Sequence, residues 1–363
     1  MLLLAFADAK RRLYNACLLR LSQAIAGILR GGWALRDAAI RSLPYWQHFT
    51  IIEVLLEVSI GSAAISLDCI DATDFVVDLQ SQVFHGKTMT NRKEIADMIV
   101  ARMTAEKERM AAQYAASRVG IGYFYIDDLL PEALARAIHA QFPKPETMKL
   151  KKTLREYKYI AAQMNNYDAI LEETVYAFQD ERVVEIVKNI CDMKSAYPDS
   201  HLYAGGISMM GKDQYLNPHL DNSHDKDRDR WRVLNLLYYV TPDWKEENGG
   251  NLEVWPGGVE QEQTVIHSRF NRLAVMATHN QSWHSVSPIK VNGFRCCISN
   301  YYFADEALKH DDTFHVTSFR GRPEQKLRDV VLRADATARM AVRKVFAKGV
   351  VENEHLYKRD QNS

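Results

Sequence analysis

Short apolar and aromatic runs dominate the chain between residues 200 and 303. They alternate apolar with polar positions or stay apolar throughout, as in ISMM, VLNLLYYV, NLEVW, RLAVMAT and FRCCISNYYF. Such runs predict β-strands when turn residues bound them. The turn signals here are Asn217-Pro218, Asn248-Gly249-Gly250, Pro256-Gly257-Gly258, Asn271 and Asn292-Gly293. Closely spaced short strands with little helix between them predict a barrel or jelly-roll sandwich rather than a parallel sheet.

The chain before residue 120 has helical spacing instead. Apolar residues recur every three or four positions between Leu13 and Ile28, which predicts an amphipathic helix, and the segment from Lys93 to Ser117 predicts another long helix. Residues 1–50 carry seven Lys/Arg and two Asp/Glu, a net charge of +5. We interpret the first helix as packed on its own domain with a solvated basic face. A helix that contacts a membrane surface or a partner is the alternative.

The remaining segments predict a mixture of elements. A short aromatic strand precedes Asp127, a helix follows Pro131, and charged periodic stretches predict helices over residues 146–163 and 168–195 and again after Pro323. We therefore predict an α+β protein in three parts. Residues 1–115 form a mainly helical region, residues 116–320 a domain whose barrel core covers about 200–303, and residues 321–363 a C-terminal helix and tail.

Charge and composition exclude some classes of protein. The chain has 363 residues, of which 47% are hydrophobic, and its 46 Lys/Arg balance its 46 Asp/Glu. A net charge of zero argues against a nucleic-acid partner. The apolar run at residues 51–66 contains Glu53 and Glu57 and is too short for a membrane span. Five cysteines without a CxxC pair suit a reducing compartment, and the N-terminal run with Asp8 makes a poor signal peptide. We expect a cytoplasmic protein.

Three residues within the strand region have the chemistry of metal ligands. His219 and Asp221 are two positions apart after a strand, so both side chains point the same way, and His284 follows 63 residues after Asp221. Two imidazoles and one carboxylate form the facial set that leaves positions open on Fe(II). His279 is the alternative second imidazole, but its gap to Arg295 is 16 residues rather than 11. Arg295, on the next predicted strand, has the planar donor fork that holds a carboxylate.

Residues 200–303 resemble the 2-oxoglutarate/Fe(II)-dependent dioxygenases, in particular the prolyl-hydroxylase-like branch. The resemblance rests on HLD at 219–221, VLNLLYYVTPDW at 233–244, GGNLEVWP at 249–256 and WHSVSPIKVNGFRCCISNYYF at 283–303, in this order. It implies a double-stranded β-helix, a jelly-roll or cupin-like barrel with supporting helices. It also implies a dioxygenase that uses Fe(II), 2-oxoglutarate and O2.

The resemblance assigns roles to individual residues. His219, Asp221 and His284 would hold the iron, and Arg295 would pair with the 5-carboxylate of 2-oxoglutarate. Ser299 and Tyr239 would donate hydrogen bonds to that carboxylate, although Tyr239 is equally compatible with a core position. Many relatives have a tyrosine where this chain has Met209, so that cosubstrate contact is either missing here or supplied by Tyr203 or Tyr215. Asp221 argues against halogenation, because chlorinating relatives have Gly or Ala there.

The expected reaction is hydroxylation of an unactivated C–H bond, or desaturation or cyclisation, with release of succinate and CO2. We expect a polar small molecule as substrate, because a charged loop at 221–231 follows the metal motif where relatives place a lid. Its cations Lys226, Arg228 and Arg230 are candidate substrate ligands, unless the loop is merely exposed. One alternative is a hydroxylase of prolyl or other protein side chains. Another is a non-catalytic metal-binding barrel that acts as an interaction module. The N-terminal helices would be the surface for any homo-oligomer.

Overall fold

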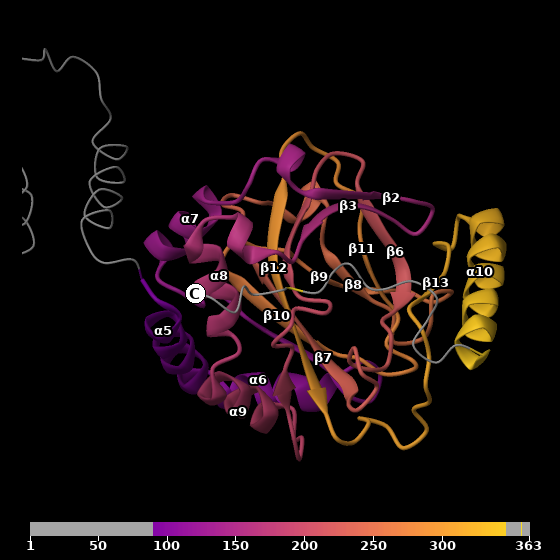
Figure 1. Ribbon diagram of the computed structural model, residues 1–363, viewed down its shortest axis with the longest axis horizontal. Helices are drawn as coiled ribbons and strands as arrows, with labels where there is room; N and C mark the ends of the chain where they lie inside the picture. Colours follow the sequence, from indigo (N-terminus) through magenta and orange to yellow (C-terminus); the bar gives the residue numbers. More distant parts are fainter. Residues whose placement is uncertain (1–89, 346–356, 358–363) are drawn as a thin grey trace, which may run out of the picture. The chain divides into compact units, whose positions relative to one another are not determined.

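The computed structural model describes residues 90–345 and Tyr357 (Figure 1). The amphipathic helix predicted between Leu13 and Ile28, and every other prediction for residues 1–89, lies outside the described residues. Among those described, each helix is too short or too polar to cross a bilayer.

The centre of the fold is an antiparallel sheet of thirteen strands among the described residues. Its main path runs β1-β10-β7-β12-β5-β3-β6-β11-β8-β9, while β13, β2 and β4 pair at its sides with β6, β3 and β12. The strands are β1 (Tyr123–Ile126), β2 (Lys149–Lys152), β3 (Glu156–Ala161), β4 (Tyr197–Pro198), β5 (Gly206–Met210), β6 (Tyr215–Leu220), β7 (Trp231–Tyr239), β8 (Leu252–Val254), β9 (Thr264–Ile266), β10 (Arg272–Ala277), β11 (His284–Val286), β12 (Arg295–Ala304) and β13 (Ser318–Phe319). The sheet curls into the double-stranded β-helix that the sequence predicted.

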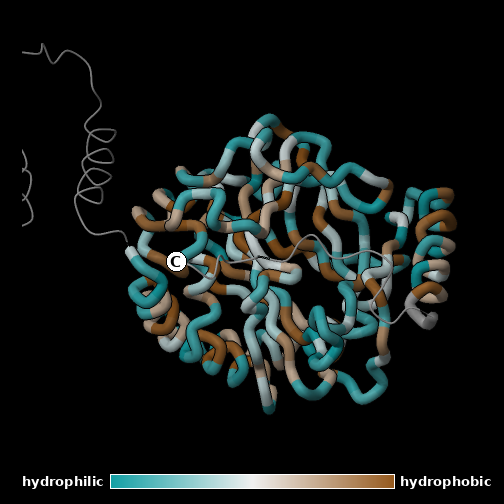
Figure 2. The backbone as a smooth tube through the Cα atoms, viewed as in Figure 1, coloured by the Kyte–Doolittle hydropathy of each residue, from teal (hydrophilic) through white to brown (hydrophobic). Residues whose placement is uncertain are grey.

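Helices α5 to α9 cover one outer face of this sheet, beside β12, β7 and β10 (Figure 1). The helices are α5 (Arg92–Ala105), α6 (Lys107–Ser117), α7 (Glu132–Ala140), α8 (Ala169–Ala177), α9 (Glu181–Ile190) and α10 (Lys326–Val345), and three short 3₁₀ turns are η2 (Pro145–Thr147), η3 (Met164–Asn166) and η4 (Glu246–Asn248). Ile99 of α5, Leu171 of α8 and Val187 of α9 share one buried cluster with strand residues such as Leu236 and Ile298. Figure 2 shows apolar stretches of chain, in brown, in the helices and in the strands.

The alternation of side chains on β12 separates this core from the inside of the barrel. Cys296, Ile298 and Tyr302 pack toward the helices, while Arg295 and Ser299 face the interior. This is the period of two that extended chain imposes. The alternation of residues in the sequence of β12 therefore predicts which of its side chains point into the barrel.

Two predicted helices differ from the structure. The segment from Lys93 to Ser117 is helical, but it divides at Glu106, which has φ −112° and whose carboxylate accepts hydrogen bonds from Arg102 and Arg109. The prediction of a helix over 146–163 is wrong, because residues 149–161 form the β2–β3 hairpin. Tyr157, Tyr159 and Ile160 favour a strand, and the high charge of the segment obscured this signal.

Candidate metal centre

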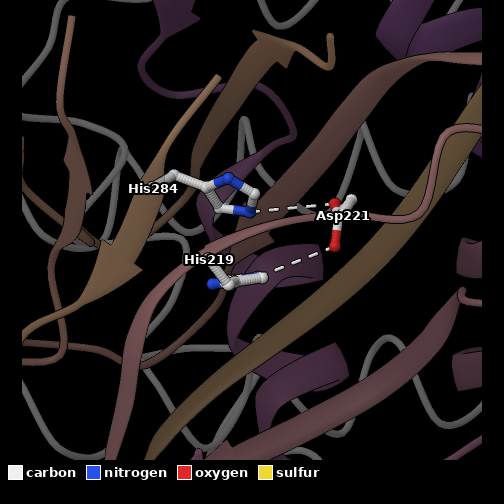
Figure 3. A group of neighbouring side chains, drawn as sticks. All are labelled: His219, Asp221 and His284. Carbon is white, nitrogen blue, oxygen red and sulfur yellow. Dashed lines mark ion pairs between the residues drawn. The ribbon is translucent and has the colours of Figure 1, made fainter. Parts of the chain in front are cut away.

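His219, Asp221 and His284 come together inside the barrel (Figure 3). His219 of β6 lies directly opposite His284 of β11 in the strand pairing, and their ring centroids are 4.0 Å apart. Asp221 follows the end of β6, and its two carboxylate oxygens lie 3.6 Å from Nε2 of His219 and 3.7 Å from Nε2 of His284. One ligand atom from each residue lies within 4.8 Å of the other two. The convergence predicted from the sequence is therefore present in the structure.

Hydrogen bonds to backbone orient both imidazoles. Nδ1 of His219 donates to the carbonyl of Asn217 over 3.0 Å, and Nδ1 of His284 donates to the carbonyl of Ser282 over 2.9 Å. A carbonyl only accepts, so Nδ1 of each ring carries a proton and Nε2 is the ring nitrogen available to a metal. Burial, followed by the neighbouring His284, lowers the pKa of His219 to about 3. His219 is therefore neutral near pH 7, the state that a metal requires of an imidazole.

Asp221 is ionised and incompletely satisfied. Burial raises the pKa of its carboxyl, but Arg232 and the two histidines outweigh that effect, and the pKa falls to about 2. Nη1 of Arg232 lies 3.5 Å from Oδ2, yet this buried oxygen has no hydrogen-bond partner. Two imidazole Nε2 atoms and a carboxylate with an unpartnered oxygen fit a mid-series divalent ion such as Fe(II).

A buried network fixes the strand that presents His284. Ser285 donates to Glu253 of β8 over 2.6 Å, and Arg322 donates to the same carboxylate oxygen over 2.7 Å. Arg322 also donates to the carbonyl of Val286 over 3.0 Å. The charge pair thus ties β8 and β11 together next to His284, and second-layer contacts of this kind hold metal ligands in place.

The three residues open onto a cavity of about 370 Å³. Arg295, Ser299 and Tyr239, the residues that the sequence analysis gave as candidate cosubstrate ligands, line the same cavity. Arg295 is 4% exposed, its Nη2 lies 2.9 Å from Sδ of Met210, and its guanidinium lies 5.3 Å from the centre of the Tyr239 ring. Within the described part of the chain, no carboxylate forms an ion pair with Arg295, and its Nε has no hydrogen-bond partner. A buried cation of this kind is a natural site for a ligand carboxylate.

Several other predicted residues lie elsewhere. Lys226, Arg228 and Arg230 are absent from the cavity lining: Lys226 pairs with Asp227, while Arg228 and Arg230 cover the rings of Phe314 and Tyr197.

The structure also distinguishes between the alternative metal and cosubstrate ligands that the sequence left open. His279 lines a small neighbouring cavity of about 10 Å³ and does not join the triad. Met209 packs in the apolar core. Tyr203 lines the main cavity, whereas the Tyr215 hydroxyl donates to the carbonyl of Thr153 and does not reach that cavity.

Five cations line the cavity that the sequence did not indicate as site residues: Lys151, Arg155, Lys158, Arg232 and Arg339. Arg232 is out of phase with the interior positions 235, 237 and 239 of its own strand. A register shift opposite Tyr302 and Phe303 carries it to the cavity side. The alternation of side chains along the sequence does not predict where such a bulge occurs. The other four come from the hairpin that was expected to be a helix and from the C-terminal helix.

Residues 205–303 match the family model of the 2OG-Fe(II) oxygenase superfamily. A prolyl-4-hydroxylase from Pseudomonas putida is similar with a TM-score of 0.41 and 15% identity, over 53% of this chain and 98% of its own. An oxidoreductase of the 2OG-Fe(II) oxygenase family from Burkholderia pseudomallei is similar with a TM-score of 0.40 and 17% identity, and the match covers 55% of this chain and 92% of that protein. HygX from Streptomyces hygroscopicus, with nickel, 2-oxoglutarate and hygromycin B bound, is similar with a TM-score of 0.38 and 13% identity. The match covers 58% of this chain and 90% of that protein. A search of curated proteins found no significant match.

The family match and the triad concern the same strands, since residues 205–303 contain His219, Asp221, His284 and Arg295. The superfamily inferred from the sequence motifs is thereby confirmed. This part of the chain is a 2OG-Fe(II) oxygenase domain, the catalytic domain of dioxygenases that use Fe(II), 2-oxoglutarate and O2.

Proposed function

We propose that this protein hydroxylates a C–H bond of a polar small molecule, with His219, Asp221 and His284 as its iron ligands. The observation that carries the proposal is the convergence of two imidazoles and an ionised carboxylate on one point of a cavity. Fe(II) and 2-oxoglutarate, when bound, supply the oxidising chemistry that transfers one oxygen atom of O2 to the substrate and the other to succinate, with loss of CO2.

The residues beyond the triad position the cosubstrate. Arg295 would hold the distal carboxylate of 2-oxoglutarate through its planar fork. The Tyr239 hydroxyl has a pKa raised by burial, so it stays protonated and is able to donate a hydrogen bond. Ser299 lies on the same side of β12 as Arg295 and adds a second hydroxyl to the cavity wall.

The size of the cavity favours a small substrate. Its volume of about 370 Å³ lies within the range of sites that enclose small molecules. Polar and charged side chains such as Asn235, Arg232 and Lys158 share the wall with apolar ones such as Leu237 and Val286. This mixture suits a substrate with polar groups.

Turnover of the cosubstrate tests the proposal. Purified protein supplied with Fe(II), 2-oxoglutarate and O2 should convert 2-oxoglutarate to succinate, and a panel of polar small molecules should identify compounds that accelerate this conversion. Mass spectrometry should find an added oxygen atom in the accelerating compound, or the loss of two hydrogens if the outcome is desaturation. The proposal fails if no succinate forms, or if the Asp221→Ala variant forms as much as the wild type. Acceleration by peptides alone would shift the substrate class to proteins.

A further inference from the structure

One wall of the cavity holds four cations around two carboxylates. Lys151 and Lys158 share Glu156, with Nζ–Oε distances of 3.5 and 3.1 Å. Arg155 and Arg339 share Asp335: Nε of each arginine donates to Oδ2, over 3.1 and 3.0 Å. We call Lys151, Arg155, Lys158 and Arg339 the cationic wall. Each carboxylate balances only one of its two cations, so the wall and its acids carry a net charge of +2.

The fold brings these charges together from two separate segments. Lys151 and Lys158 lie directly opposite each other in the pairing of β2 with β3, an arrangement that destabilises a strand pair when both residues have the same charge. Arg155 lies just before β3, and Arg339 comes from α10. All four cations line the cavity that contains the metal triad.

The cations of the wall lie close enough to act on one another. Lys158 lines the same cavity as His219 and Asp221. Burial and then the neighbouring Arg155 lower the pKa of Arg339. Repulsion between cations is therefore part of the free protein, and an anion bound between them would relieve it.

We propose that the cationic wall binds an oxyanion of the substrate, a carboxylate or a phosphate, while the C–H bond to be oxidised lies at the metal. This inference deepens the proposed function and rests on it. Arg295 comes from β12, whereas the cationic wall comes from the β2–β3 hairpin and α10. Because Arg295 is already assigned to 2-oxoglutarate, the cationic wall is left for a second anion. Two anchored ends would fix one orientation of the substrate, and such positioning contributes strongly to catalysis.

Three matched probes test the inference: glucose 6-phosphate, glucuronate and neutral glucose. Each is titrated by calorimetry, without O2, into protein loaded with Ni(II) and saturating 2-oxoglutarate, so that the metal and Arg295 are already occupied. We expect the two anions to bind with a Kd of the order of 1 mM, weaker at high salt, and glucose not to bind. The difference between the two anions identifies whether phosphate or carboxylate is preferred.

Variants locate the binding. Lys158→Gln and Arg339→Gln should each weaken anion binding about tenfold, equivalent to about 1.4 kcal/mol. Glu156→Gln should strengthen it, because the competing carboxylate is removed. Lys152→Gln is the matched control: Lys152 neighbours Lys151 on β2 but lies over the Tyr157 ring, 4.8 Å from its centre, and does not line the cavity. It should bind anions as the wild type does.

The outcomes separate this inference from the proposed function. If Ni(II) and 2-oxoglutarate bind but the anions do not, or bind no better than glucose, the inference is overturned and the proposed function stands. Anion binding that is unchanged in both Lys158→Gln and Arg339→Gln also overturns it. Failure to bind Ni(II) and 2-oxoglutarate at all overturns the proposed function instead.

Discussion

Replacing Arg295 with methionine should separate cosubstrate binding from stability. Arg295 is 4% exposed, and among the described residues its guanidinium has no carboxylate partner. Loss of a buried, charge-assisted contact with a ligand carboxylate costs about 2–5 kcal/mol. At about 1.4 kcal/mol for each factor of ten, the Kd for 2-oxoglutarate should rise by about 30-fold to several thousand-fold.

The same change should not weaken the fold of the ligand-free protein. An unpaired buried charge opposes folding, and replacing buried charges with apolar groups of similar volume is often neutral or stabilising by about 1–4 kcal/mol. The melting temperature of Arg295→Met should therefore equal or exceed that of the wild type. Calorimetric titration with 2-oxoglutarate in the presence of Ni(II), together with thermal unfolding, measures both effects.

Arg272 provides a matched control on β10. It is also buried, but its Nε and Nη2 donate to Asp127 over 2.6 and 2.9 Å. Arg272→Met should lower the free energy of unfolding by up to about 3 kcal/mol, because Asp127 loses its main partner, and should leave the Kd for 2-oxoglutarate unchanged. If Arg295→Met instead destabilises the fold as Arg272→Met does, and binds 2-oxoglutarate as tightly as the wild type, then Arg295 is a structural residue and the reasoning is refuted.

Three further predictions follow from other parts of the structure. Asp221→Ala should abolish tight binding of Ni(II), measured by calorimetry, while circular dichroism stays that of a folded protein. Asn271→Ala should lower the free energy of unfolding in urea by about 3 kcal/mol or more, because three hydrogen bonds to Leu130 and Tyr238 are lost at a residue with φ +58°. Burial raises the pKa of Glu156, but Lys158 and Lys151 depress it to about 2 from an ordinary 4.5, so its stabilisation is complete above pH 4.5 and is lost as the pH falls toward 2. The stability of Glu156→Gln should accordingly depend less on pH below 4.5.

The metal site could be predicted because its signals are local. His219 and Asp221 lie two residues apart at the end of a strand, so alternation alone places both side chains on one side. The alternation from Arg295 to Ser299 on β12 likewise predicted that both would face the interior, and the cavity lining agrees. The strand pairing that places His284 opposite His219 is long-range, and no local pattern in the sequence predicts it.

The cationic wall could not be predicted, because three of its members lie on a hairpin that the sequence predicted as a helix and the fourth, Arg339, lies on the distant C-terminal helix. Lys158 and Arg339 are brought together by the packing of a hairpin and a terminal helix, and neither segment carries a motif. Arg232 enters the cavity only through a register shift, which reverses the side expected from alternation. The charged loop with Arg228 looked more suitable for substrate binding, but its guanidinium lies 3.9 Å from the centre of the Phe314 ring instead.

The central claim is that three side chains hold one metal ion. X-ray diffraction at the iron absorption edge, from crystals grown anaerobically with Fe(II) and 2-oxoglutarate, tests it most directly. The account predicts one anomalous peak about 2.0–2.2 Å from Nε2 of His219, from Nε2 of His284 and from a carboxylate oxygen of Asp221. A peak at other residues, or no peak in crystals whose solution contains saturating iron, would contradict it.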